Sequence, residues 1–221
     1  MRPILTAIGE VGIHAGGRTY MLRPSLFAMS RLGSPEEIVE TYTHVMGGAK
    51  LPPPLNAAQV AAWPGRLARM QFSAALAVLH ACAEDDLSAA RLVGGINERG
   101  DYTGGAVPPR DIVVLAQSLM RHGVNGDQEP GGDDEYPEER GEYSARFDPR
   151  EHAAAAMAHL GATEAEAWAM TMTGLVGGLK SKYPVRNLDP KGKPVPPKPS
   201  LKQYDQAAEW LAEINRKRAN G

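Results

Sequence analysis

Three short segments carry the residue pattern of a helix start, and they constrain the fold more than any other feature of the chain. Ser34-Pro35-Glu36-Glu37 combines an N-cap serine, a proline at the first helical position and a glutamate three residues after the cap. Asp148-Pro149-Arg150-Glu151 repeats this pattern, and Thr163 with Glu166 forms another capping box. Because apolar residues at helical spacing follow such starts, the sequence predicts a mainly α-helical protein, built as a helical bundle.

The composition favours close-packed helices. Of the 221 residues 43% are hydrophobic, yet only three are Phe and three are Trp, so much of any core must come from alanine and aliphatic residues. The formal net charge of -2 predicts no general attraction to nucleic acid. One cysteine excludes an internal disulfide and suggests a reducing cytosol. The longest apolar run, around 73–82, is about half of a membrane span, so no membrane segment is expected.

A small N-terminal β-hairpin is expected before the helices. Val11 and Ile13 alternate with small or polar residues, the glycine pair 16–17 permits a turn, and Tyr20 and Leu22 continue the alternation. Pro24 then ends strand pairing, because proline has no backbone N–H to donate. Ser25 follows as the N-cap of a short helix that stops at Gly33.

The order of these patterns predicts four regions along the chain. Residues 1–123 hold the hairpin and a helical domain, and 124–146 form an acidic flexible linker or loop. Residues 147–184 form a smaller helical region. Residues 185–221 begin as a proline-rich extended segment and end in an amphipathic helix capped by Ser200.

Several boundaries within the first region are less sharply marked. Asn56 is expected to cap a short helix, and Pro64 to open a stronger one that runs to about Ala83. A short helix over 87–93 and a glycine-rich loop over 94–109 should follow. The next helix, headed by Asp111, is expected to stop at Gly123.

Few residues suggest chemistry. His80 and Cys82 stand two apart on a helix and point to different faces, so Cys82 is interpreted as a buried small hydrophobe and His80 as a partly buried or surface residue. The acidic run 84–86 is interpreted as the end of one helix and the cap of the next. His152 and His159 share a helix face but lack a third ligand. We therefore expect no catalytic residue, no cofactor and no metal site.

Apolar and aromatic residues near helix starts are the remaining candidates for function, which favours protein–protein recognition. Nine methionines add adaptable apolar surface, although core filling is the more common use of methionine. The candidate partner-binding residues are Leu26, Phe27, Met29, Ile38, Tyr42, Trp168, Met170 and Met172. The stretch from 18 to 42 serves as scaffold instead if its aromatic side chains are buried, and scaffold is the interpretation we favour.

DNA binding is a weaker alternative. Residues 161–183 can be scanned as a helix-turn-helix, but the second helix holds three glycines, two lysines and no arginine.

Two segments resemble tail assembly chaperones of long-tailed (siphovirus-type) bacteriophages. In the first segment the matching residues are Tyr20, Leu22, Arg23, Pro24, Ser25 and Ala28, which lead from a small hairpin into helices. In the second segment they are Leu160, Gly161, Thr163, Glu166 and Ala167, followed by Met170 and Thr171 as a Met-Thr step. Together the two segments cover somewhat over a quarter of the chain.

The resemblance implies a non-enzymatic assembly factor of the bacterial host cytoplasm that is not expected in the mature virion. The upstream helical domain would shield the tape measure protein, a long helical rod, and the downstream region would recruit tail tube subunits. Self-association is compatible with this role, whereas nucleic acid and membrane partners are not implied. A structural tail component, such as a completion or connector protein, remains the first alternative, ahead of the helix-turn-helix regulator.

Overall fold

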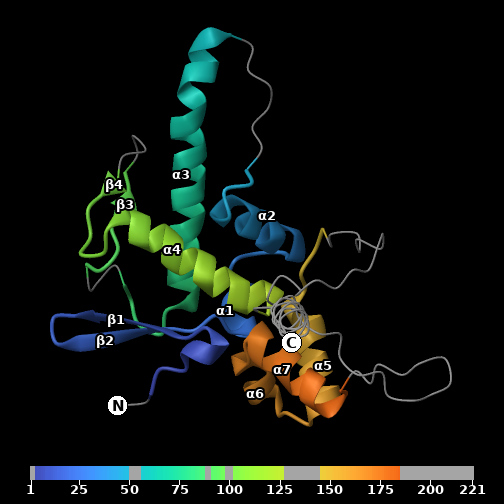
Figure 1. Cartoon of the computed structure of the whole chain (residues 1–221). Helices are drawn as coiled ribbons and strands as arrows, with labels where there is room; N and C mark the ends of the chain where they lie inside the picture. Colours follow the sequence, from blue (N-terminus) through green and yellow to red (C-terminus); the bar gives the residue numbers. More distant parts are fainter. Residues whose placement is uncertain (1–2, 50–55, 88–90, 98–101, 127–144, 185–221) are drawn as a thin grey trace, which may run out of the picture. The chain divides into compact units, whose positions relative to one another are not determined.

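The computed structural model describes residues 3–49, 56–87, 91–97, 102–126 and 145–184. This part of the chain is mostly helical and contains two small antiparallel hairpins, which agrees with the predicted class (Figure 1). Most of the expected acidic linker, and the proline-rich segment with its final helix, lie outside the described residues.

The N-terminal hairpin forms as predicted. After a short 3-10 helix, η1 (Thr6–Ile8), strand β1 (Val11–Ala15) pairs with β2 (Arg18–Leu22) in a register that sets Val11 opposite Leu22. The two turn glycines, 16 and 17, both have positive φ (57° and 73°), as a two-residue hairpin turn with the right-handed strand twist requires.

The predicted caps start the first helices. Helix α1 (Leu26–Ser30) begins at Ser25, whose Oγ accepts a 3.1 Å hydrogen bond from the Ala28 N–H. Helix α2 (Pro35–Val45) begins with the complete capping box between Ser34 and Glu37. These bonds satisfy N–H groups that have no partner within the helix.

The expected break before Pro64 does not occur. Helix α3 (Ala57–Cys82) is continuous and carries Pro64 in its interior. Proline lacks the N–H that would bond to residue 60, which weakens but does not end a helix whose later turns are held by packing. The later turns contact α2, and also α4 (Pro109–Met120), which crosses α3 in Figure 1.

The chain between α3 and α4 also differs from expectation. No helix is present at Leu87 or at 91–93, where the Leu92 N–H donates a 3.0 Å bond to the Leu87 carbonyl; 88–90 lie outside the described residues. The glycine-rich loop contains a second hairpin of β3 (Gly95–Ile96) and β4 (Tyr102–Thr103). Phe72 of α3 meets Tyr102 edge to face, with ring centroids 5.1 Å apart, and so holds this hairpin against α3.

Two helices end in a wide π turn closed by a left-handed glycine. Helix α4 runs into η2 (Arg121–Asn125) and stops at Gly126, φ 75°, and not at Gly123 as expected. Gly123 instead lies where a side chain would meet Met29 Sδ at 2.8 Å. Helix α5 (Pro149–Ala155) runs into η3 (Ala156–Leu160) and stops at Gly161, as predicted.

The last described elements are α6 (Glu164–Ala169), started by the predicted Thr163–Glu166 capping box, and α7 (Met172–Lys182). Their buried residues belong to the same core as the upstream helices. This core includes Leu22, Leu26, Leu79, Leu119, Phe147, Ala156, Ala167 and Leu175. The two helical regions that the sequence separates by an acidic segment therefore share one hydrophobic core.

Candidate functional site

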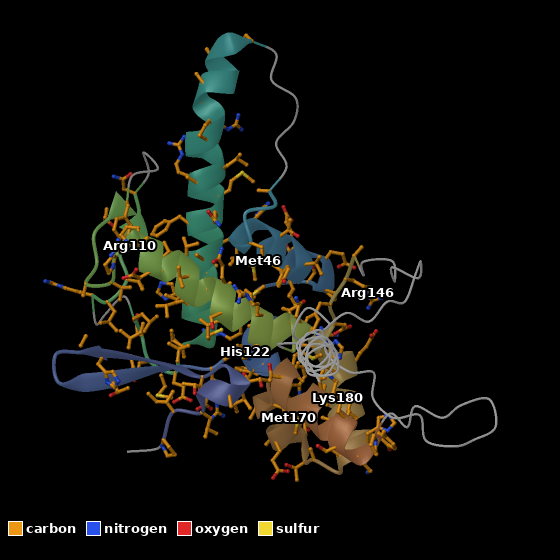
Figure 2. All side chains as sticks on the ribbon, viewed as in Figure 1. Met46, Arg110, His122, Arg146, Met170 and Lys180 are labelled. Carbon is orange, nitrogen blue, oxygen red and sulfur yellow. The ribbon has the colours of Figure 1, made fainter. Side chains whose placement is uncertain are left out.

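The two segments that carry the family resemblance meet in space. The Leu26 N–H donates a 2.8 Å hydrogen bond to the Met170 carbonyl, and Ser25 forms an antiparallel β-bridge with Thr171. Thr171 is 1% exposed, and its Oγ1 accepts a 3.1 Å bond from Gly174 N. Figure 2 labels Met170 in the orange part of the ribbon that α6 and α7 form. A short backbone pairing thus joins the start of α1 to the start of α7.

The first segment also anchors the hairpin to the end of α3. The Arg23 N–H donates to the Cys82 carbonyl at 2.8 Å, and the Glu84 N–H donates to the Met21 carbonyl at 3.1 Å. Residues 21–26 therefore form backbone hydrogen bonds both to the end of α3 and to the residues just before α7. We call residues 21–26, together with these two parts of the chain, the junction.

A buried ion pair reinforces this junction. The carboxylate of Glu10 is fully buried and accepts from the Leu5 N–H at 3.0 Å and from Nε and Nη2 of Arg23, both at 2.9 Å. Arg23 itself is 23% exposed. A buried carboxylate is tolerated when its oxygens are occupied in this way, so the pair fixes the N-terminal segment against the hairpin.

Four of the eight candidate partner-binding residues are core residues. Leu26, Met29 and Ile38 are fully buried, and Met172 is 8% exposed. Because their apolar surface is already covered by the chain itself, a partner cannot touch them in this conformation. We assign these four to the scaffold, whereas the condition set from the sequence, burial of both Phe27 and Tyr42, is not met because Phe27 is 58% exposed.

The other four reach the surface to different extents. Phe27 is 58% exposed, whereas Tyr42, Trp168 and Met170 are partly buried against the core. The Tyr42 hydroxyl accepts a 2.7 Å hydrogen bond from Nδ2 of Asn125, which ties α2 to the end of η2. Of the eight, only Phe27 offers a mostly free apolar side chain.

A second exposed region lies where no site was predicted, on the N-terminal half of α3. Every side chain described between Asn56 and Arg69 is exposed, except for the half-buried Leu67. In Figure 1 this half of α3 extends past α2 and α4. The sequence signal for this region is that positions 41–83 contain no Asp or Glu, so this helix has no acidic polar face.

The chemically suggestive residues have structural explanations. Cys82 is buried, and burial raises the pKa of its thiol to about 12, as expected for an unreactive core cysteine. Asp85 forms a 2.7 Å ion pair with Arg18 of the hairpin, and no helix start follows the acidic run in the described residues. Together with Arg31 and His80, residues 83–86 line a shallow polar concavity.

His152 also has a structural role. His152 packs against Phe147 with ring centroids 4.7 Å apart, and burial lowers its pKa. Within the described ranges, no three His, Cys, Asp or Glu side chains gather closely enough to bind a metal ion. Helix α7, which would be the second helix of the helix-turn-helix alternative, turns Met172 and Leu175 into the core. Among helices in the described part, none combines the length and apolar character needed to cross a bilayer.

Comparison with known proteins gives one match, to a family model described as a family of unknown function, DUF6246, which aligns with residues 22–206. The match begins at Leu22, which forms a β-bridge with Ala83 directly after α3, and it includes the paired residues Leu26 and Met170. The chain matches none of the curated proteins and none of the solved structures with which it was compared. Since the model covers most of its length, the chain belongs to the DUF6246 family.

Proposed function

We propose that this member of the DUF6246 family is a phage tail assembly chaperone. In this role it shields the tape measure protein and recruits tail tube subunits while the tail is built. It acts in the cytoplasm of the bacterial host, carries out no chemistry of its own, and leaves before the virion is complete. The tape measure protein and the tail tube protein are its expected partners.

One observation carries the proposal. The two segments that resemble tail assembly chaperones are separated by more than a hundred residues, yet they pair directly through Leu26 and Met170 and through Ser25 and Thr171. Two unrelated chance similarities would have no reason to meet. Their pairing supports treating them as one unit of the fold, although the paired residues are largely buried and are not the partner surface.

The exposed part of α3 supports a role in helix recognition. The described exposed side chains of this half are mostly alanine with no carboxylate among them, and apolar surface that stays in contact with water costs free energy. Contact with a helical rod would remove that cost. Each such contact is small, so a coat of many copies could hold the rod through avidity and still be displaced when tube subunits arrive.

Co-expression tests the proposal. The candidate tape measure protein, to be identified as a long, helix-rich open reading frame downstream of this gene, should be insoluble alone and soluble when the full chain is produced with it. A matched control uses Leu26→Asp, which places a charge in the core and should abolish the effect along with the fold. Failure of the wild-type chain to increase the soluble fraction would overturn the proposal. Mass spectrometry of purified particles gives a second test, because a stoichiometric presence in virions indicates a structural tail component instead.

A further inference from the structure

We propose that the N-terminal half of α3, residues 57–70, docks an amphipathic helix of the partner whose apolar stripe is flanked by acidic side chains. This inference rests on the proposed function and specifies the face and the chemistry that the function uses. It is carried by the exposure, the charge and the size of this half of the helix.

The exposed side of this half of the helix is lined mainly by alanine, together with two arginines. Ala58, Ala61, Ala62 and Ala68 are exposed, and Leu67 and Met70 are half-buried. Leu67 and Met70 are three residues apart, so they lie on the same side of the helix and extend the row of α3 residues that pack inside the protein. The four alanines lie on the side of the helix opposite Leu67 and Met70, and their small side chains let a second helix approach closely.

The charge of this face has one sign. Arg66 and Arg69 are exposed and stand three residues apart, so they project from neighbouring positions on the helix surface. The only other residue in α3 that can carry a positive charge is His80, near its far end, and the helix contains no carboxylate. The two guanidinium groups therefore have no acidic neighbour on their own helix. Carboxylates flanking the apolar stripe of a partner helix would pair with them and fix its register.

The size of the face argues against a second copy of this chain as its occupant. Fourteen residues give a helix segment about 21 Å long and about 11 Å wide, so half of its lateral surface is roughly 360 Å². A stable interface buries about 800 Å² on each partner. Pairing two copies through this face would bury too little and would also place four arginines together. A long rod that offers the same contact repeatedly suits a small, weak site.

Two synthetic peptide helices test the inference with the full chain. Both carry leucines at heptad spacing; one has glutamates flanking the leucine row, and the other has lysines at the same positions. In fluorescence anisotropy titrations at low salt, the chain should bind the glutamate peptide about tenfold more tightly than the lysine peptide. Raising the salt concentration should shrink this ratio towards one.

Charge reversal on α3 provides the decisive variant. The double substitution Arg66→Glu and Arg69→Glu should invert the peptide preference, and Arg66→Gln with Arg69→Gln should remove it without inversion. The matched control is Arg110→Glu with Arg121→Glu, which changes the net charge equally at exposed residues on α4 and η2 and should leave the preference intact. Arg110 lies at the start of α4 (Figure 2).

The outcomes separate this inference from the proposed function. Equal binding of the two peptides, or an equal effect of the control variant, would overturn the inference. In co-expression, a wild-type chain that keeps the rod soluble while the glutamate double variant does so equally well would leave the function standing and reject the site. A wild-type chain that fails in co-expression but discriminates between the peptides would retain the site and reject the function.

Discussion

The backbone N–H of Leu26 and the carbonyl oxygen of Met170 lie 2.8 Å apart and join two segments that the sequence places at opposite ends of the described chain. Leu26 is fully buried at this junction, whereas its neighbour Phe27 points outward and is 58% exposed. Adjacent residues of one short helix thus have opposite environments, which makes them a matched pair for experiment.

Leu26→Ala is expected to lower the free energy of unfolding by about 3 kcal/mol, because it removes buried methyl groups and leaves a cavity. Phe27→Ala should change it by less than about 0.5 kcal/mol. Urea unfolding followed by circular dichroism measures both. Similar losses for the two variants would contradict the assignment of Leu26 to the core and Phe27 to the surface.

Glu10→Gln should destabilise the protein by about 3 kcal/mol, because the substitution leaves the partly buried guanidinium of Arg23 without its counter-charge. The control is Asp85→Asn. It breaks the more exposed pair with Arg18, whose side chain is 62% exposed, and should cost less than about 1 kcal/mol. Denaturant midpoints of the three proteins measure the difference. A larger cost for Asp85→Asn than for Glu10→Gln would show that the buried pair is not the stronger anchor.

Cys82 should resist thiol reagents in the folded protein. Burial raises the pKa of its thiol to about 12, so the reactive thiolate is scarce at pH 8 and is also inaccessible. Labelling with a chromogenic disulfide should follow the rate of unfolding, and the denatured chain should react at once. Immediate labelling of the native protein would contradict the burial.

The same raised pKa predicts a decline in stability at alkaline pH. Above about pH 9 the unfolded chain releases the thiol proton while the folded chain retains it, so the unfolded state becomes more stable relative to the folded state until the pH reaches about 12. Cys82→Ala should flatten this decline. Thermal unfolding at pH 8, 9 and 10 compares the two proteins, and parallel curves would exclude a contribution from Cys82.

His152 makes stability sensitive to mild acid. Burial against Phe147 lowers its pKa, so the unfolded chain binds a proton more readily than the folded chain does. Stability should therefore fall as the pH drops below about 6.5 and continue to fall until the pH passes the lower pKa of the folded state. Replacing His152 by Gln should reduce the slope of the melting temperature between pH 7 and pH 5. An unchanged slope would assign the acid sensitivity to other groups.

Two glycines, one inside α7 and one at the end of η2, should respond in opposite directions to substitution by alanine. Gly177 lies inside α7 with no neighbouring atom within 4 Å of an added Cβ, so Gly177→Ala should stabilise by about 0.5–1 kcal/mol. Gly126 closes η2 with φ at 75°, and an added Cβ would lie 3.1 Å from Val176 Cγ2. Gly126→Ala should therefore destabilise. Thermal melts of both variants against the wild type measure the two signs.

The sequence predicted those features of the fold that depend on near neighbours. Ser25, Ser34, Asp148 and Thr163 all cap helices where expected, because a cap bond joins a side chain to a backbone N–H two or three residues away. Gly161 stops its helix for an equally local reason, since left-handed backbone favours glycine.

Features that depend on distant residues were missed. The local sequence at Pro64 predicts a helix start, but packing of the later turns keeps α3 continuous through this residue. The second hairpin depends on close backbone contact: a Cβ on Gly94 would lie 1.7 Å from the Thr103 carbonyl oxygen. Of two glycines near the end of α4, the sequence favoured Gly123, whereas contact with Met29 explains that glycine and Gly126 ends the helix.

The candidate site shows the same difference between what near neighbours determine and what distant residues determine. Apolar spacing identified Leu26, Met29 and Ile38 as important but could not tell a core face from a partner face, because both need the same residues. The exposed half of α3 went unrecognised because alanine-rich turns resemble core helix until their neighbours are known. The pattern that distinguishes it is the missing acidic face, which is a property of the whole helix.

The hydrogen bond between Leu26 and Met170 can form only late in the synthesis of the chain. A ribosome that has just made α1 must add about 144 more residues before the partner carbonyl exists, which takes roughly 7–29 s at common elongation rates. Throughout that interval the nascent chain exposes apolar side chains that the finished protein conceals. A chain that stopped before α5 would lack Ala156, Ala167 and Leu175, and the apolar side chains that these residues cover would stay in contact with water.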